Sequence, residues 1–216
     1  RQQYPEEELA LLMGTDMFRS FPTWYCPDEI CRQASLAVLY RSGKHWEEMR
    51  AQAERLRLDL RACALTGADV IVVSCSTLSP SVRLLRGEVN VPVVAIDDAM
   101  VREAVRKGRR IGLLATANST VKPSESAIYA AAEAAGKQID LQVLCNEDAI
   151  RALKAGDRQT HDRLVLELAE ALGVCDVIVL AQASMAHMEQ AVQQKTGVFT
   201  LTSPARCIEQ VRELLV

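Results

Sequence analysis

The 216-residue sequence has few aromatic residues, little net charge and no long apolar run, and each shortage excludes a class of protein. Aromatic residues make up only 4% of the chain, so we do not expect a surface that stacks nucleic-acid bases. The net charge of −3 provides no basic surface for a phosphate backbone. No apolar stretch approaches the roughly 18 residues of a membrane-spanning helix. We therefore expect neither nucleic acid nor a membrane as a partner.

The cysteines and histidines do not form a known metal-binding or redox pattern. The seven cysteines are odd in number, and their spacings match no zinc or thioredoxin motif. With only three histidines, we predict no metal site built from cysteine and histidine. The phosphate-binding motifs GxGxxG and GxxxxGK[ST] are also absent, so a nucleotide site is not supported. A reducing cytoplasm is the simplest location for such a chain.

Short continuous apolar runs alternate with segments of helical periodicity. Continuous runs are typical of parallel strands that are buried on both faces. Left-handed caps are expected at glycines 67, 108, 136, 156 and 173, and N-caps at Ser124, Asn146 and Asp157. The pattern predicts an α/β fold with a parallel sheet. The expected strands are 70–74, 92–96, 111–115, 141–145, 177–181 and 198–201, and the expected helices are 45–65, 98–107, 124–135, 147–155, 158–172, 185–195 and 204–215.

The second half of the chain repeats the pattern of the first at an offset of 107 residues. Residues 68–78 align with residues 175–185, and the same offset aligns 91–94 with 198–201. Because the spacing between strands repeats as well, the chain is interpreted as a duplicated α/β unit. We predict two pseudo-symmetric parallel-sheet halves, with the active site in the cleft between them. The halves are expected to be residues 1–96 plus 204–216 and residues 97–203.

The repeat also leads to a prediction for the N-terminal region. In this alignment Leu9–Met13 takes the place of the second strand of the first half. The first strand would then precede Arg1, so the given sequence is predicted to lack one N-terminal strand. Residues 14–43 have no counterpart in the second half and are interpreted as an insertion, either a lid or a contact of a homodimer.

Small hydroxylated residues follow three of the predicted strands. Ligands of open parallel sheets bind beyond the carboxyl ends of the strands. Helices that start there point backbone N–H groups at the ligand, which can hold a carboxylate or an oxyanion without a metal. The candidate site therefore consists of the residues at these three strand ends: Cys75, Ser76 and Thr77; Thr116, Ser119 and Thr120; and Gln182, Ala183 and Ser184.

Cys75 is the only cysteine at such a strand end. Helix N–H groups can lower the pKa of a thiol, which then acts as a base, an acid or a nucleophile. The alternative is a buried structural cysteine, which is the common role of the residue. His187, just past the end of another strand, is either a partner of Cys75 or a surface residue.

The remaining polar candidates have simpler interpretations. His45 and His161 lie near predicted helix starts and are expected to be solvated. Asp97 and Asp98 begin a helix and are expected to cap it, with ligand binding as the alternative.

Several motifs together resemble the aspartate/glutamate/hydantoin racemase superfamily, which includes arylmalonate decarboxylase and maleate isomerase. These are Cys75-Ser76-Thr77, Ile96-Asp97-Asp98 and the segments 111–116 and 179–185. The resemblance rests on their order and spacing and covers the chain from about residue 65 to residue 205. It implies two pseudo-symmetric α/β halves with the active site between them. It also implies chemistry next to the carboxylate of a small carboxylic or amino acid, with no cofactor.

The sequence departs from this family at one position. Racemases of the family use two cysteines on opposite faces of the substrate carbon, and the resemblance places them at Cys75 and Gln182. An amide cannot exchange a proton at neutral pH, so a two-thiol racemisation does not fit. Four functions remain open: a racemase or isomerase acting through Cys75, a decarboxylase with a single cysteine, a module that binds a small acid without turnover, and a cysteine hydrolase that pairs Cys75 with His187.

Overall fold

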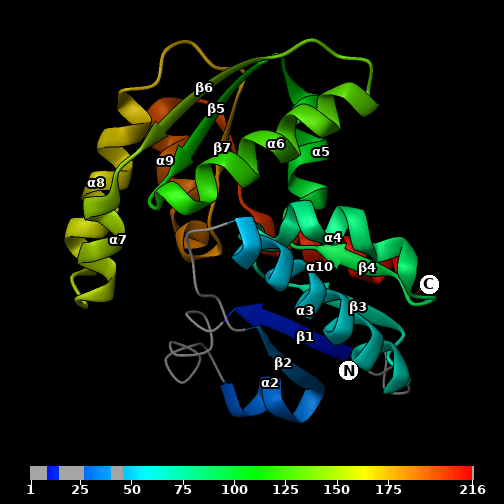
Figure 1. The fold of residues 1–216 in the computed structure, drawn as a ribbon. Helices are drawn as coiled ribbons and strands as arrows, with labels where there is room; N and C mark the ends of the chain where they lie inside the picture. Colours follow the sequence, from blue (N-terminus) through cyan, green and yellow to red (C-terminus); the bar gives the residue numbers. More distant parts are fainter. Residues whose placement is uncertain (1–8, 15–26, 40–45, 216) are drawn as a thin grey trace. The chain divides into compact units, whose positions relative to one another are not determined.

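Parallel strands form two four-stranded sheets in the part of the chain that the computed structural model describes, residues 9–14, 27–39 and 46–215 (Figure 1). The chain divides into two units. Unit 1 comprises Arg1–Ile96 and Glu209–Val216, and unit 2 comprises Asp97–Ile208. Each unit contains one of the sheets. None of the described helices is both long and apolar enough to cross a lipid bilayer.

The sheet of unit 1 has the strand order β2-β1-β3-β4. Its strands are β1 (Leu9–Gly14), β2 (Ala34–Leu39), β3 (Val70–Val73) and β4 (Val93–Ala95). Apolar side chains of two helices, α3 and α4, pack in one core with those of the strands. The helical segments are α2 (Pro27–Gln33), α3 (Trp46–Leu65), the short 3-10 helix η2 (Ser76–Leu78), α4 (Ser79–Leu85) and the 3-10 helix η3 (Arg86–Glu88).

The sheet of unit 2 has the equivalent order β6-β5-β7-β8. Its strands are β5 (Arg110–Ala115), β6 (Asp140–Cys145), β7 (Val177–Leu180) and β8 (Phe199–Leu201). The helical segments are α5 (Asp98–Lys107), α6 (Asn118–Ala134), α7 (Glu147–Lys154), α8 (Arg158–Glu170), the 3-10 helix η4 (Ala183–Met188), α9 (Glu189–Thr196) and α10 (Ser203–Leu214). The last of these continues into unit 1 after Ile208.

The sheet of unit 2 is covered on both faces, as the continuous apolar runs predict. On one face, Ile111 and Leu113 of β5 pack in a core with residues of α5 and α6. On the other face, Leu114 of β5 and Leu180 of β7 pack with residues of α7, α8, η4 and α9. Figure 1 shows α5 and α6 together on one side of this sheet and α7, α8 and α9 on the other.

The two sheets share their register as well as their strand order, so the predicted α/β fold with two parallel-sheet halves is confirmed. Ile71 of β3 lies opposite Val93 of β4. Ile178 of β7 lies opposite Thr200 of β8, and both residues of this pair are 107 positions further along the chain. A repeat that preserves both spacing and register is the structural counterpart of the duplication in the sequence.

The assignment of the N-terminal strands is corrected by the sheet topology. β1 lies between β2 and β3, as β5 lies between β6 and β7, so Leu9–Met13 belongs to the first strand of its unit and not to the second. The second strand is β2, which lies inside the segment interpreted as an insertion without a counterpart. The repeat therefore gives no reason to place a further strand before Arg1. The predicted lid or dimer contact falls largely on residues 15–26 and 40–45, outside the described residues.

Unequal connections explain why the repeat was misaligned there. Along the chain, 25 residues separate Ala10 from its strand partner Ser35, whereas 30 separate Gly112 from Gln142. The constant offset of 107 residues thus holds for β2 and the later strands but not for β1.

The predicted helix ends are partly confirmed. The side chains of Asn146 and Asp157 accept hydrogen bonds from the backbone N–H groups of Asp148 and Thr160, as N-caps do. Ser124 is not a cap, because α6 starts at Asn118 and runs through Pro123. Gly67, Gly136 and Gly156 have left-handed backbones as expected.

Gly108 is extended rather than left-handed, with φ at −157°, and close packing is the reason for a glycine at this position. A Cβ atom on Gly108 would lie 2.3 Å from Cβ of Asp176. One carboxylate oxygen of Asp176 accepts hydrogen bonds from the backbone N–H groups of Arg109 and Arg110, each at 2.9 Å. The Arg110 guanidinium binds the other oxygen, and together these donors hold the pKa of Asp176 well below its usual range.

We predict that Gly108→Ala destabilises the protein by about 1–3 kcal/mol, because the added methyl group must displace Asp176. Urea unfolding measures the free energy of unfolding. Gly87→Ala is the matched control, since nothing lies within 4 Å of the position that its Cβ would take. Equal stability of the two variants would show that the contact with Asp176 is not tight.

Candidate functional site

The end of β7 is joined to the end of β5 by the side chain of Gln182. Gln182 is extended and precedes η4. Its Oε1 atom accepts a hydrogen bond of 3.0 Å from the backbone N–H of Thr116, which directly follows β5. This bond fixes which end of the amide is the oxygen. The NH₂ group is consequently the end that is left to donate to a ligand.

The three candidate residues after β5 differ in their surroundings. Thr116 is completely buried, and its hydroxyl oxygen finds no hydrogen-bond partner among the described residues. The hydroxyl of Thr120 donates to the backbone oxygen of Ala117 at 2.8 Å and closes the first turn of α6. Ser119 is exposed on the same turn. Thr116 is therefore the one of the three that lies against Gln182 and has a hydroxyl group to offer.

Cys75 occupies in unit 1 the position that Gln182 occupies in unit 2. It follows β3, has an extended backbone and precedes η2. The N–H of Leu78 donates to the backbone oxygen of Cys75 at 2.9 Å, and Met185 makes the same bond to Gln182 at 3.0 Å. The two strand ends therefore form the same type of backbone turn. They differ in the side chain at its first residue, which is Cys75 in one unit and Gln182 in the other.

Cys75 itself is 4% exposed and belongs to the apolar core of unit 1. Ser76 and Thr77 follow it on η2 and are half-buried. In unit 2 the equivalent residues are Ala183, which is half-buried, and Ser184, which is exposed. The predicted cleft between the halves, and the predicted pairing of Cys75 with His187, both involve two units and stay predictions.

Most other cysteines are poor nucleophiles. Burial raises the pKa of the thiols of Cys63, Cys145 and Cys175. Burial and, less strongly, the negative charges of Asp98 and Asp97 raise the pKa of the Cys207 thiol to about 12. These four thiols are therefore protonated at neutral pH, as structural cysteines are. Cys31 on α2 is exposed.

The structure shows Asp97 and Asp98 buried at the start of α5. Asp97 occupies the N-cap position, but its side chain makes no capping hydrogen bond, so the predicted capping role of this side chain is wrong. Both residues are almost completely buried. They follow β4 along the chain after the single residue Ile96, and the alternative prediction of ligand binding stays open.

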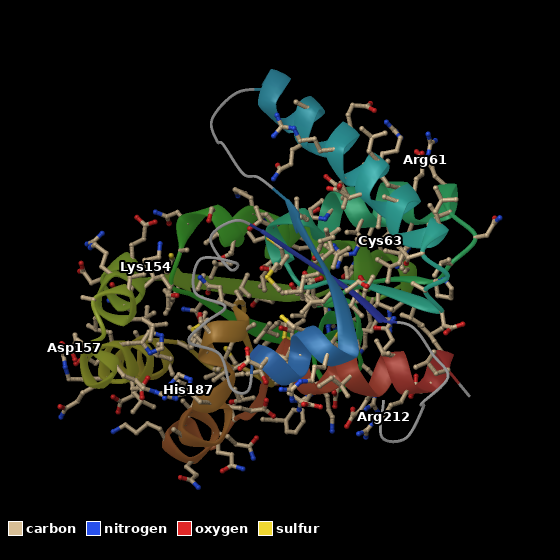
Figure 2. The ribbon with its side chains drawn as sticks, turned by 90° about the horizontal axis from the view of Figure 1, so that it is seen from below. Arg61, Cys63, Lys154, Asp157, His187 and Arg212 are labelled. Carbon is tan, nitrogen blue, oxygen red and sulfur yellow. The ribbon has the colours of Figure 1, made fainter. Side chains whose placement is uncertain are left out.

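A group that the sequence interpretation missed lies on α8 and η4. His161 is completely buried, so the expectation that it is solvated is wrong. Its Nδ1 atom lies 2.7 Å from Oδ1 of Asp162, and Nε2 of His187 lies 2.7 Å from the same oxygen. Figure 2 labels His187 on the orange segment, near the yellow-green helices of unit 2. The sequence contained one signal: His161, Val165 and Ala169 recur every four residues on the buried face of α8.

These contacts determine the charge of Asp162. Burial alone would raise the pKa of its carboxyl group, but the hydrogen bonds to His161 and His187 outweigh burial. The pKa of Asp162 is held below its ordinary value, so the carboxylate is charged at neutral pH.

The chain belongs to the Asp/Glu/Hydantoin racemase family, whose sequence pattern matches residues 35–211. This agrees with the two parallel-sheet halves and with the resemblance in the sequence. Allantoin racemase from Klebsiella pneumoniae has a similar fold, with a TM-score of 0.67 at 15% identity over 97% of this chain and 88% of that one. Unliganded arylmalonate decarboxylase has a TM-score of 0.61 at 14% identity over 97% of this chain and 93% of that one.

Curated proteins with similar sequences cover different shares of the chain. An uncharacterized protein of Schizosaccharomyces pombe is 27% identical over 198 residues, 89% of this chain and 77% of its own length. A probable nicotinate-nucleotide adenylyltransferase of Chlorobium phaeovibrioides is 33% identical over 89 residues. That match covers 41% of this chain and only 38% of the adenylyltransferase, so it does not extend over the whole of either protein.

We predict that Gln182→Met lowers the free energy of unfolding by about 1–3 kcal/mol, because the buried N–H of Thr116 loses its acceptor. Gln182→Glu is the control, since a carboxylate oxygen can accept the same bond. Urea unfolding of both variants distinguishes them. If the methionine variant were as stable as the glutamate variant, the bond would not hold the two strand ends together.

Proposed function

We propose that the protein is a cofactor-independent racemase or isomerase that acts through Cys75 at the carbon next to the carboxylate of a small carboxylic or amino acid. The observation that carries this proposal is the equivalence of Cys75 and Gln182. This chain belongs to the racemase family, and the two residues occupy equivalent turns, Cys75 after β3 and Gln182 after β7. Parallel sheets bind their ligands at these ends.

The residues around Gln182 are suited to hold a carboxylate. Gln182 and Thr116 are linked by a hydrogen bond, and each has a further donor: the NH₂ group of Gln182 and the hydroxyl of Thr116. A buried hydroxyl without a partner is costly, and a ligand oxygen would satisfy that of Thr116. We assign supporting contacts to the other candidates: Ser76, Thr77, Ser119, Thr120, Ala183 and Ser184. One donor aimed at a developing oxyanion is typically worth about 3–4 kcal/mol of barrier.

Cys75 would supply the chemistry on one face of the substrate. As a thiolate it removes the proton on the carbon next to the carboxylate, and the electron pair of the C–H bond moves into the carboxylate as an enediolate. In an unsaturated substrate it adds to one carbon of the C=C bond while the π electrons move into the carboxylate. After rotation about the resulting single bond, the electron pair returns, the C–S bond breaks and the isomerised double bond forms. A reducing cytoplasm would keep Cys75 in the thiol form that either route requires.

A decarboxylase is the second candidate, and Gln182 is the observation that favours it. Racemisation needs a proton donor on each face of the carbon, and an amide whose oxygen is bonded to Thr116 cannot be one. Decarboxylation needs a donor on only one face. The C–C bond to one carboxylate breaks, CO₂ leaves, and the resulting enediolate takes the proton of the Cys75 thiol.

Incubation in D₂O tests both candidates. Amino acids, hydroxy acids and malonates are incubated with the protein, and NMR follows deuterium at Cα, inversion, double-bond geometry and loss of CO₂. We expect turnover of at least one class and a loss of at least about 10²-fold in Cys75→Ala. Cys31→Ala, which removes an exposed thiol of the same unit, is expected to retain the activity. Binding of these acids without any turnover would instead identify a binding module.

A second thiol tests the role of Gln182. We predict that Gln182→Cys lowers the enantiomeric excess of the deuterated product, because a thiol at the equivalent turn can return the proton from the other face. Chiral chromatography of the product measures this. An unchanged enantiomeric excess, with turnover retained, would mean that residue 182 does not face the reacting carbon.

A further inference from the structure

We propose that His161, Asp162 and His187 form a binding site for one divalent transition-metal ion of the zinc class, which clamps α8 to η4. Each of the three residues offers one ligand atom, and these atoms all lie within 4.8 Å of one another. The site lies wholly within unit 2. It is separate from the residues that we assign to the substrate.

The three side chains converge on one point. Oδ1 of Asp162 lies 2.7 Å from Nδ1 of His161 and 2.7 Å from Nε2 of His187. The two imidazole rings are 5.7 Å apart between centroids and tilted by 31°. Two nitrogen atoms therefore approach one carboxylate oxygen from two elements, α8 and η4, that are distant in the sequence.

The spacing of these atoms fits a tetrahedral ion after a small adjustment. Bonds to zinc of 2.0–2.2 Å place neighbouring ligand atoms about 3.4 Å apart. The two distances from Asp162 must therefore lengthen by about 0.7 Å. The side chains of Asp162 and His187 are 31% and 28% exposed, so they can make this movement and a water molecule can take the fourth position.

The buried histidine supports the assignment. His161 is completely buried, and its Nε2 atom has no hydrogen-bond partner among the described residues. Its ring is therefore oriented by Asp162 through the other nitrogen, with Nδ1 toward the cluster. A buried imidazole that is fixed in this way offers a preorganised ligand, since little side-chain freedom remains to be lost on binding.

The donor set selects the kind of ion. Two imidazole nitrogens and one carboxylate suit Zn²⁺, Co²⁺, Ni²⁺ and Cu²⁺. Mg²⁺ and Ca²⁺ prefer oxygen ligands throughout and are expected to bind poorly. The sequence contained no metal-binding motif at these residues, because two adjacent ligands followed by a third 25 residues later match no common metal motif.

The ion would fix the segment that follows Gln182. η4 begins at Ala183 and carries His187, whereas α8 carries the other two ligands. A metal bond between them removes local opening of this 3-10 helix, so binding should raise the melting temperature of the protein.

Titration of the chelator-stripped full chain with ZnCl₂ tests the site. Equilibrium dialysis with elemental analysis gives stoichiometry and affinity, and Co²⁺ serves as a spectroscopic probe. We expect one Zn²⁺ per chain, no competition by excess Mg²⁺, and a visible Co²⁺ spectrum typical of four-coordination. His187→Ala and Asp162→Asn should each weaken binding by more than the 10–100-fold typical of an outer-shell change. His45→Ala, which removes the remaining histidine of the sequence, should bind as the wild type does.

Two results would overturn the proposal. One is Zn²⁺ binding that persists in both His187→Ala and Asp162→Asn, which would place the ion elsewhere. The other is a wild-type protein that binds no stoichiometric Zn²⁺, which would leave the three residues as a hydrogen-bonded group only. Where zinc binds, X-ray absorption at the zinc edge of the wild-type protein tests its ligands without any variant, because it reports imidazole ligation directly.

Discussion

The proposed chemistry depends on one constraint: β3 and β7 are each a central strand of their own sheet, with a hydrogen-bonded strand on either side. Each of these strands is held between two parallel partners, β3 by β1 and β4, and β7 by β5 and β8. Their register is therefore fixed, and a slip by one residue would turn every buried side chain to the other face. As a result, the second residue beyond each strand has a fixed position in its unit. Those positions hold Cys75 and Gln182.

The duplication preserved the backbone at these two positions but not the side-chain chemistry. Each turn is closed by an equivalent backbone hydrogen bond, in which the N–H three residues further along donates to the backbone oxygen of Cys75 or of Gln182. One turn carries a thiol, which can exchange a proton, and the other carries an amide, which can only hold hydrogen bonds. The amide is moreover tied to Thr116 of the adjacent strand end. This difference is why the proposed function assigns proton transfer to Cys75 and only hydrogen bonding to Gln182.

The later strands could be predicted from the sequence because they are continuous apolar runs whose spacing repeats. β1 and β2 were misplaced because their connection differs in length from that of β5 and β6. The candidate residues at the strand ends followed from topology alone, since parallel strands place their carboxyl ends at one edge. The bond between Gln182 and Thr116 could not be predicted, because it depends on side-chain orientation. The group on α8 and η4 could not be predicted either, since only the packing of these helices brings His187 to Asp162.

The most direct measurement asks whether a small acid reaches Cys75. The protein is treated with iodoacetamide, with and without malonate, and mass spectrometry follows alkylation of the peptides that contain Cys75 and Cys31. We expect Cys75 to be alkylated and malonate to slow this reaction, whereas alkylation of the exposed Cys31 is unaffected. A Cys75 that stays unmodified while Cys31 reacts completely would contradict the proposed role of Cys75, because the thiol would then be a core residue without access to any substrate.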